Sequence, residues 1–332
     1  AEKFNNKTRE KMKKLLFVLS LVGLMFAESK LSGVTYFDYT KTEKQSGFYF
    51  QRQYFGYGGD ISEKVSYKIL FDVGRTEIGT VKYKNEVGEF EEKSEDTRLV
   101  TYLKKAQINY KSSLGKFNFG LIGMNTYGVQ EKNWGYRFLE KSAIDKYGFS
   151  ATADIGVGFS RSLIENLNLS LQIVNGEGFK KPQGDKFQKI AFNATYGEGN
   201  FNKNDGHNAG LVYTMESTDT DPTTMTSLFG GYSGMGLRIG GEYDMQTKGN
   251  VESNIVSVSA NYNVRENIDI FARYDIYDSD NSVENNGENY LVTGIVLTCD
   301  GGISIAPNLR MTSYEDDSKA LTEYKVNFQF KF

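Results

Sequence analysis

The chain has 332 residues, with 39 basic and 42 acidic side chains and a formal net charge of −3 at pH 7. Aromatic residues make up 14% and there are 35 glycines, but only 3 prolines, 1 cysteine and 1 histidine. A single cysteine excludes an intramolecular disulfide framework, the single His207 argues against a histidine-based metal site or a Ser-His-Asp triad, and the lack of a basic excess argues against nucleic-acid binding.

The N-terminal stretch has the pattern of an export signal. From Met12 onward, two lysines precede an apolar run that ends at Ala27. This run is too short to cross a membrane as a helix. We expect residues 1–27 to be a signal peptide with its start at Met12, and residues 28–332 to form a single domain. The alternative for residues 1–11 is a genuine, long n-region.

From Lys30 onward the chain reads as strand, turn, strand without a break. The abundance of tyrosine, phenylalanine, threonine and glycine favours strands and turns over helices. We expect about sixteen strands, although fourteen or eighteen would fit the same pattern. They are predicted at about 31–41, 47–60, 64–75, 98–111, 115–124, 147–160, 165–175, 186–197, 207–217, 223–232, 235–247, 253–265, 267–279, 289–299, 302–315 and 320–332.

Most strands alternate between an apolar and a polar face. In the last strand, Phe328 and Phe330 alternate with Asn327 and Gln329. Period-two alternation places the two sets on opposite faces of a sheet. Full charges occur on the polar face too often for a dry protein core. The pattern therefore predicts an all-β fold, a transmembrane antiparallel up-and-down β-barrel with lipid outside and water inside.

The connections differ in length, as they do in outer-membrane barrels. Tight turns are expected at 165–166, 265–267 and 300–301. Long polar loops are expected at 76–97, 176–185, 198–206, 217–222 and 279–288. The segment 125–146 contains the only tryptophan and a helix-compatible stretch. Long loops with their own structure are usually functional, so we expect this one to fold inward and narrow the bore. The alternative is an exposed surface loop.

Charged residues on the polar face are the candidate pore lining, because pore width and charge set selectivity. The alternation predicts these pore-lining residues: Arg52, Lys68, Asp72, Lys105, Arg238, Glu242, Arg273, Asp275, Arg310 and Lys325. The candidate constriction residues from the inward loop are Trp134, Arg137, Glu140 and Lys141. Opposite charges across a constriction set up a transverse field that hydrated solutes tolerate. The alternative is that these side chains hydrate the interior or hold loops by ion pairs.

Four stretches resemble a known family. They are FYFQRQYFGYGG at 48–59, ISEKVSYKILFDVG at 61–74, WGYRFLEKS at 134–142 and LSLQIVNGEGF at 169–179. Together they resemble the phosphate-selective O and P family of outer-membrane porins. The resemblance implies a sixteen-stranded, trimeric barrel that conducts small anions. Arg52 stands where that family has its first inward arginine, and Tyr54 departs from the second arginine that is common there.

We therefore expect an outer-membrane porin of a bacterium, a passive channel for small hydrophilic solutes or ions. Its expected partners are outer-membrane lipid, these solutes and, from the resemblance, two further copies in a homotrimer. No enzyme activity, metal, cofactor or nucleic acid is expected. One alternative is a closed structural or adhesive barrel that acts through its surface loops. A second alternative is a soluble secreted β protein.

Overall fold

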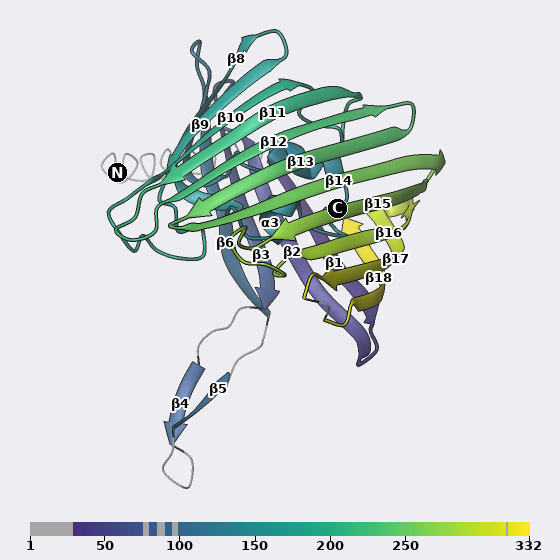
Figure 1. Cartoon of the computed structure of the whole chain (residues 1–332). Helices are drawn as coiled ribbons and strands as arrows, with labels where there is room; N and C mark the ends of the chain where they lie inside the picture. Colours follow the sequence, from purple (N-terminus) through teal and green to yellow (C-terminus); the bar gives the residue numbers. More distant parts are fainter. Residues whose placement is uncertain (1–28, 76–79, 85–89, 95–98, 317) are drawn as a thin grey trace, which may run out of the picture.

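A computed structural model describes residues 29–75, 80–84, 90–94, 99–316 and 318–332. Within this part of the chain, sixteen antiparallel strands close into one barrel, which confirms the predicted fold class and strand number (Figure 1). A barrel of this size leaves room for an aqueous channel. The barrel strands are β1 (Lys30–Lys41), β2 (Ser46–Asp60), β3 (Val65–Arg75), β6 (Leu99–Lys111), β7 (Lys116–Gly123), β8 (Ala153–Ile164), β9 (Leu167–Val174), β10 (Lys189–Gly197), β11 (Gly206–Glu216), β12 (Thr223–Gly234), β13 (Leu237–Lys248), β14 (Val251–Arg265), β15 (Ile268–Asp278), β16 (Glu288–Cys299), β17 (Ile303–Tyr314) and β18 (Leu321–Lys331).

The first and last strands close the barrel. They pair in an antiparallel register that runs from Val34 opposite Lys331 to Lys41 opposite Tyr324. Beyond this ladder, the backbone N–H of Gly33 donates to the carbonyl of Phe332 at 2.9 Å. On the outer face, the rings of Phe37 and Phe328 stack with their centroids 4.7 Å apart. Closure satisfies the edge hydrogen bonds that an open sheet would leave unpaired in lipid.

The two faces of the sheet differ as the alternation predicts. On β15, Ile270 and Tyr274 are exposed on the outer wall, whereas Arg273 and Asp275 between and beyond them are 2% and 0% exposed. The same division holds along β18, where Phe330 is exposed and Asn327 is buried. Apolar side chains therefore cover the outside of the cylinder, and polar side chains point inward. Among the described residues, no helix is long and apolar enough to cross a membrane.

Successive turns alternate between the two ends of the barrel, so chain order assigns each connection to one end. One end carries mostly tight connections, among them 165–166, 235–236 and 266–267, and the other carries the long ones. Two connections differ from expectation. The eight-residue connection 198–205 lies at the tight-turn end, although its length suggested the other. The connection between β13 and β14 is only Gly249 and Asn250, yet it lies at the long-loop end.

The segment 76–97 was expected to be a loop, but it contains two short strands. These are β4 (Thr80–Lys84) and β5 (Phe90–Ser94), which pair as a separate two-stranded sheet. Figure 1 shows this hairpin projecting away from the barrel. The expected signal peptide, residues 1–27, lies outside the described residues.

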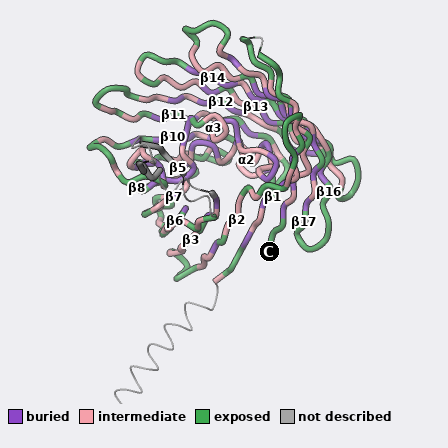
Figure 2. The backbone as a smooth tube through the Cα atoms, turned by 90° about the horizontal axis from the view of Figure 1, so that it is seen from below, coloured by how far each residue is buried: buried purple, intermediate pink, exposed green. Residues whose placement is uncertain are grey.

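Residues 124–152, here called the inner loop, lie inside the ring of strands (Figure 2). The loop contains the short helices α2 (Gly128–Trp134) and α3 (Ala143–Lys146). Gly135 ends α2 with a φ of 83°, a left-handed conformation that glycine adopts without strain. Ile144 and Ala143 of α3 are fully buried. Helix α2 packs on β12 and β13, and α3 packs on β14.

Candidate functional site: a charged bore beside the inner loop

Side-chain amides of α2 bind the inner loop to β11 and β12, the strands opposite β1 in the barrel. Gln130 Nε2 donates to Ser227 Oγ of β12 at 3.2 Å. Asn133 and Asn208 of β11 exchange two side-chain hydrogen bonds of 2.9 Å each. A Cβ added to Gly231 would lie 2.8 Å from Asn133 Nδ2, so the absence of a side chain there lets α2 approach the sheet.

Trp134 continues this anchor. Its ring packs edge-on against Phe271 of β15, with centroids 5.9 Å apart, and its Nε1 donates to the carbonyl of Glu140 at 3.0 Å. Asn261 Nδ2 of β14 donates to the Trp134 carbonyl at 3.2 Å. The indole is 3% exposed. Trp134, predicted as a constriction residue, therefore packs between the loop and the wall.

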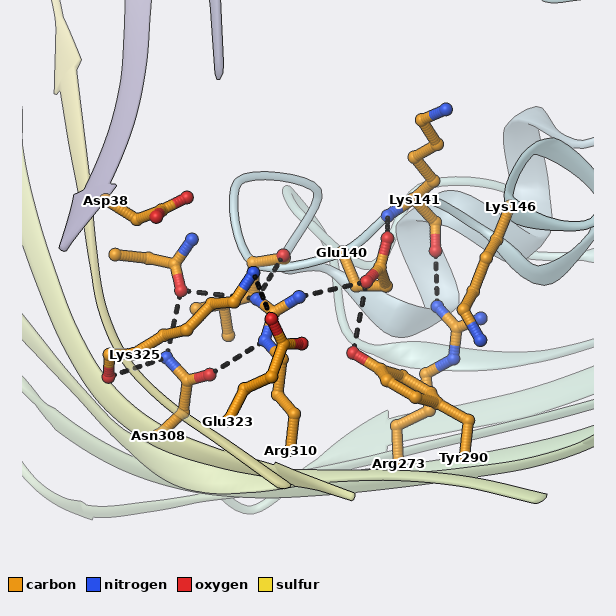
Figure 3. Close-up of polar contacts among 12 residues, drawn as sticks. Asp38, Glu140, Lys141, Lys146, Arg273, Tyr290, Asn308, Arg310, Glu323 and Lys325 are labelled. Carbon is orange, nitrogen blue, oxygen red and sulfur yellow. Dashed lines mark hydrogen bonds and ion pairs between the residues drawn. The ribbon is translucent and has the colours of Figure 1, made fainter. Parts of the chain in front are cut away.

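A second anchor joins the loop to β16, β17 and β18 (Figure 3). Arg310 Nη2 donates to the Leu139 carbonyl at 2.7 Å, and Arg310 Nη1 lies 3.0 Å from Glu140 Oε2. The Tyr290 hydroxyl donates to the same carboxylate oxygen at 3.0 Å. Asn327 Nδ2 donates to the Phe138 carbonyl at 3.3 Å. The backbone carbonyls of the loop thus find donors on the wall, as buried polar groups require.

A third anchor is a bidentate pair on β15. Arg273 binds Asp275 through Nε at 2.7 Å and Nη2 at 2.8 Å, and its Nη1 donates to the Lys141 carbonyl. The guanidinium lies 5.5 Å from the centroid of Trp134. Lys146 Nζ of α3 lies 3.7 Å from Asp275. Both β15 residues lie under the inner loop.

Two further predicted lining residues also contact connections. Arg238 donates to Asn202 Oδ1 at 3.0 Å and to the Phe201 carbonyl at 2.7 Å, so it holds the connection 198–205. Glu242 faces a small cavity under α2 and accepts a hydrogen bond from the backbone N–H of Ala143. The inward face of β13 therefore contacts both the connection 198–205 and the inner loop.

The remaining space of the bore lies between the inner loop and the strands β1, β2, β6, β17 and β18. It includes two open chambers that share Arg52, Arg137 and Lys141. The first, the β6 chamber, has a volume of about 260 Å³; its other lining residues are Lys104, Asp145, Ala151, Thr152, Glu177, Gly178, Phe179, Lys180 and Lys181. The second, the β1 chamber, has a volume of about 230 Å³; its other lining residues are Tyr36, Asp38, Gln51, Phe138, Leu139, Glu140, Arg310, Lys325 and Asn327.

A buried carboxylate organises the cations on the wall. Asp72 is 0% exposed. Arg52 Nη1 lies 2.6 Å from its Oδ2, and Lys104 Nζ lies 3.6 Å from the same atom. Lys104 also donates to the Tyr54 hydroxyl at 3.1 Å. One carboxylate thus holds two cations at the edge of the β6 chamber.

Across the bore, the inner loop presents Arg137 and Lys141. Arg137 Nε lies 3.1 Å from Glu131 and its Nη2 lies 3.5 Å from Asp145, while Lys141 Nζ lies 4.0 Å from Asp145. Burial opposes the charge on Arg137, but Tyr54, Glu131 and Asp145 outweigh it and raise its pKa. Burial raises the pKa of Glu131, although Arg137 opposes this. Arg137 therefore stays charged inside the bore, beside the carboxylates of Glu131 and Asp145.

Lys68, Lys105 and Lys325 occupy the inward positions of β3, β6 and β18. Lys68 is exposed and pairs in register with Gln107. Lys105 is opposite Leu70 and lies beside Gly123, where the inner loop begins. Lys325 lines the β1 chamber and lies 3.4 Å from Glu323. Of these three lysines, only Lys325 lines the β1 chamber.

Lys104 lines the β6 chamber, although strict alternation from Lys105, which was predicted to point inward, would put Lys104 on the lipid face. The ladder between β3 and β6 pairs Leu70 with Lys105 but Phe71 with Leu103. Lys104 is the extra residue of this β-bulge, and the bulge turns its side chain inward. The connection 175–188 supplies Phe179, Lys180 and Lys181, which a polar loop sequence does not distinguish from surface residues. Among the described residues, no group of histidine, cysteine, aspartate and glutamate is placed to hold a metal ion.

The barrel resembles outer-membrane proteins of Gram-negative bacteria, porins among them. The high-pH structure of OprB from Pseudomonas putida superposes with a TM-score of 0.67 at 10% identity over 94% of this chain and 96% of that one. OmpF of Salmonella typhi, in complex with daunomycin, gives 0.66 at 11% identity over 92% and 97%. An anion-selective porin from Comamonas acidovorans gives 0.62 at 12% identity over 92% and 99%.

These identities are low, so the likeness shows the fold. No protein-family model matches the chain. A search of curated proteins found no match either.

Proposed function

We propose that this chain is an outer-membrane porin through which small hydrophilic solutes diffuse passively. The observation that carries the proposal is the inner loop, which packs on one side of a closed barrel and leaves charged, open chambers on the other. A loop fastened in this way narrows the channel without filling it.

We propose further that the channel favours anions. The chambers are lined by more cations than carboxylates. The cations are Arg52, Lys104, Arg137, Lys141, Lys180, Lys181, Arg310 and Lys325; the carboxylates in the lining are Asp38, Glu140, Asp145 and Glu177. Three further carboxylates, Asp72, Glu131 and Glu323, pair with lining cations from outside the lining, so the excess is small. The chain as a whole is slightly acidic, with a net charge of −3, so this excess is local. Selectivity follows from charges near the narrow section of a pore.

The finer parts of the proposal concern family and assembly. The motifs that resemble the O and P porins, together with the porin-like fold, support placement in the outer membrane with the apolar wall facing lipid. One similar structure, OmpT of Vibrio cholerae, is described as a trimer form, and it superposes with a TM-score of 0.63 at 12% identity. We propose a homotrimer for this chain. Its mass in detergent, measured by light scattering, tests this separately from conduction.

A closed barrel that acts through its surface loops is the competing function. Its specific support is that Arg238, Arg273 and Arg310 are hydrogen-bonded to loops, as a plugged barrel requires. The chambers that share Arg52 and Arg137 favour the channel instead.

Planar bilayers decide between these functions. The purified barrel is expected to insert as discrete current steps in KCl. In a KCl gradient, the reversal potential is expected to have the sign of anion preference. A folded, inserted barrel that passes no current would support the closed barrel, and a reversal potential of cation sign would refute the anion preference alone.

A further inference from the structure

The connection 175–188, between β9 and β10, folds toward the bore. The backbone N–H of Phe179 donates to the Ala153 carbonyl at 3.0 Å. The Phe179 ring then stacks on Tyr102 of β6, with centroids 6.0 Å apart and planes 28° from parallel. An aromatic ring from a polar loop is thereby fixed at the wall of the β6 chamber.

Cations surround this aromatic pair. Lys104 Nζ lies 5.4 Å from the centroid of Phe179, and Lys180 Nζ lies 5.9 Å from it and 5.8 Å from that of Tyr102. Arg52 and Arg137 line the same chamber. An ammonium within about 6 Å of a ring is attracted to the ring face. The lining of the chamber therefore combines an aromatic ring with six cations and only two carboxylates, Asp145 and Glu177.

An inorganic anion would interact with only one part of this lining. A chloride or phosphate ion needs only the cations, and an apolar ring beside it offers no favourable contact. A solute with a carboxylate at one end and an aromatic ring at the other would contact both kinds of wall. The volume of about 260 Å³ corresponds to roughly eight or nine water molecules at about 30 Å³ each. A single-ring carboxylate fits within this volume.

We propose that the β6 chamber is a binding subsite for aromatic carboxylates on their way through the channel. The carboxylate is held between Arg52, Arg137 and Lys104, and the ring of the solute packs against Phe179. This inference rests on the proposed porin function and adds the class of organic anion that the bore retains longest.

Current block in planar bilayers tests the proposal. Benzoate and acetate, which differ in the ring, are added to the long-loop side, and the fall in chloride current is recorded for each. Benzoate is expected to reduce the current at a lower concentration than acetate. In Phe179→Ala, the half-blocking concentration of benzoate is expected to rise roughly five- to tenfold, as the loss of one aromatic contact implies, and that of acetate to stay the same.

Two further variants sharpen the result. Phe179→Tyr keeps the ring and is expected to block like the unmodified protein. Phe187→Ala removes a ring on the same connection that lies under Lys186 at 4.9 Å and does not line the chamber, and it is expected to change nothing.

The outcomes separate the two proposals. Equal block by benzoate and acetate overturns the subsite and leaves the channel intact. Phe179→Ala could instead raise the chloride conductance and leave the ratio of the half-blocking concentrations of benzoate and acetate unchanged. That result would show that Phe179 only obstructs the bore, and it would also overturn the subsite. No current from the unmodified barrel refutes the channel itself.

Discussion

Arg310 on β17 lies 3.0 Å from the carboxylate of Glu140 on the inner loop, although 170 residues separate them in the chain. The same guanidinium donates to the Leu139 carbonyl and lies 3.0 Å from Asn308 Oδ1. One wall arginine therefore holds both the backbone and a side chain of the segment that narrows the bore. In the proposed channel, the open width of the bore depends on contacts like this one as well as on the barrel.

Arg310→Ala is expected to widen and loosen the channel. The variant leaves Glu140 without its nearest cation and the Leu139 carbonyl without a donor. Breaking a largely buried, hydrogen-bonded ion pair costs about 3–5 kcal/mol in stability when one partner stays behind. We expect a larger single-channel conductance with more current noise, measured in KCl.

The control for this prediction is Lys319→Ala. Lys319 pairs with Glu43 between two exposed loops, and its side chain is 77% exposed. Exposed pairs contribute little. Unchanged conductance in Arg310→Ala would show that the other anchors suffice to hold the loop.

Removal of Arg137 is expected to reduce anion preference. Arg137 lines both chambers, and it neutralises Glu131 and Asp145. Arg137→Ala therefore removes one positive charge, leaves Glu131 without its paired arginine and leaves Asp145 with Lys141 alone. Since a charge at about 4 Å is worth about 1 kcal/mol even in water, we expect the anion-to-cation permeability ratio to fall at least fivefold. Reversal potentials in a KCl gradient measure this ratio.

Two comparisons make the Arg137 experiment specific. Lys141→Ala removes a more exposed cation from the same chambers and is expected to have a smaller effect in the same direction. Lys116→Ala, an exposed residue at the start of β7 near the tight-turn end, is expected to have none. Equal shifts in all three variants would mean that long-range charge, and not the chamber, sets selectivity.

The barrel was predictable because the alternation of apolar and polar residues can be seen within each short stretch of sequence. Period-two alternation assigns each residue of a strand to a face, and lipid outside requires the apolar face to point outward. Ile270 and Arg273 could therefore be placed from sequence alone. The rule fails wherever a residue is inserted into the ladder. Lys104 is such a residue, and the bulge at this position turns a predicted lipid-facing lysine into a neighbour of Asp72.

The contacts of the loops were not predictable from the sequence. Nothing local distinguishes Arg310, which holds the inner loop, from Lys325, which pairs with Glu323 on its own strand. Both are cations on an inward face. Phe179 belongs to a polar, glycine-containing stretch, and its stacking on Tyr102 joins residues that are distant in the chain. Such pairings depend on the three-dimensional path of the loops.

Acidification is expected to increase anion preference through Glu131. Burial raises the pKa of this carboxyl, so it takes up a proton at a higher pH than an exposed glutamate does. As pH falls, Glu131 becomes neutral before an exposed glutamate would, and the charge of Arg137, 3.1 Å away, is no longer balanced by it. The bore then gains positive charge. Reversal potentials from pH 7 downward measure the change.

Glu131→Gln is expected to show the acid-state preference already at neutral pH and to lose this step of the titration. Glu63→Gln, in the exposed turn between β2 and β3, is expected to keep it. A pH profile that is the same in Glu131→Gln and the unmodified protein would assign the titration to another group.

The neighbours Ile69 and Leu70 on β3 test which face meets lipid. Leu70 shares the inward face with Asp72 and pairs with Gly56, whereas Ile69 pairs with Tyr57 and Ala106 on the outer face. The two side chains are alike in size and polarity and are adjacent in the chain, so only their direction differs. A lysine on the lipid face near the middle of the membrane costs about 2–4 kcal/mol, but a lysine in a water-filled bore costs little. We expect Ile69→Lys to lower the free energy of unfolding from lipid vesicles by about that amount and Leu70→Lys to leave it nearly unchanged. Urea titration followed by the fluorescence of Trp134, the only tryptophan, measures both. Equal losses in the two variants, or a larger loss for Leu70→Lys, would contradict the assignment of the apolar face to the outside of the barrel.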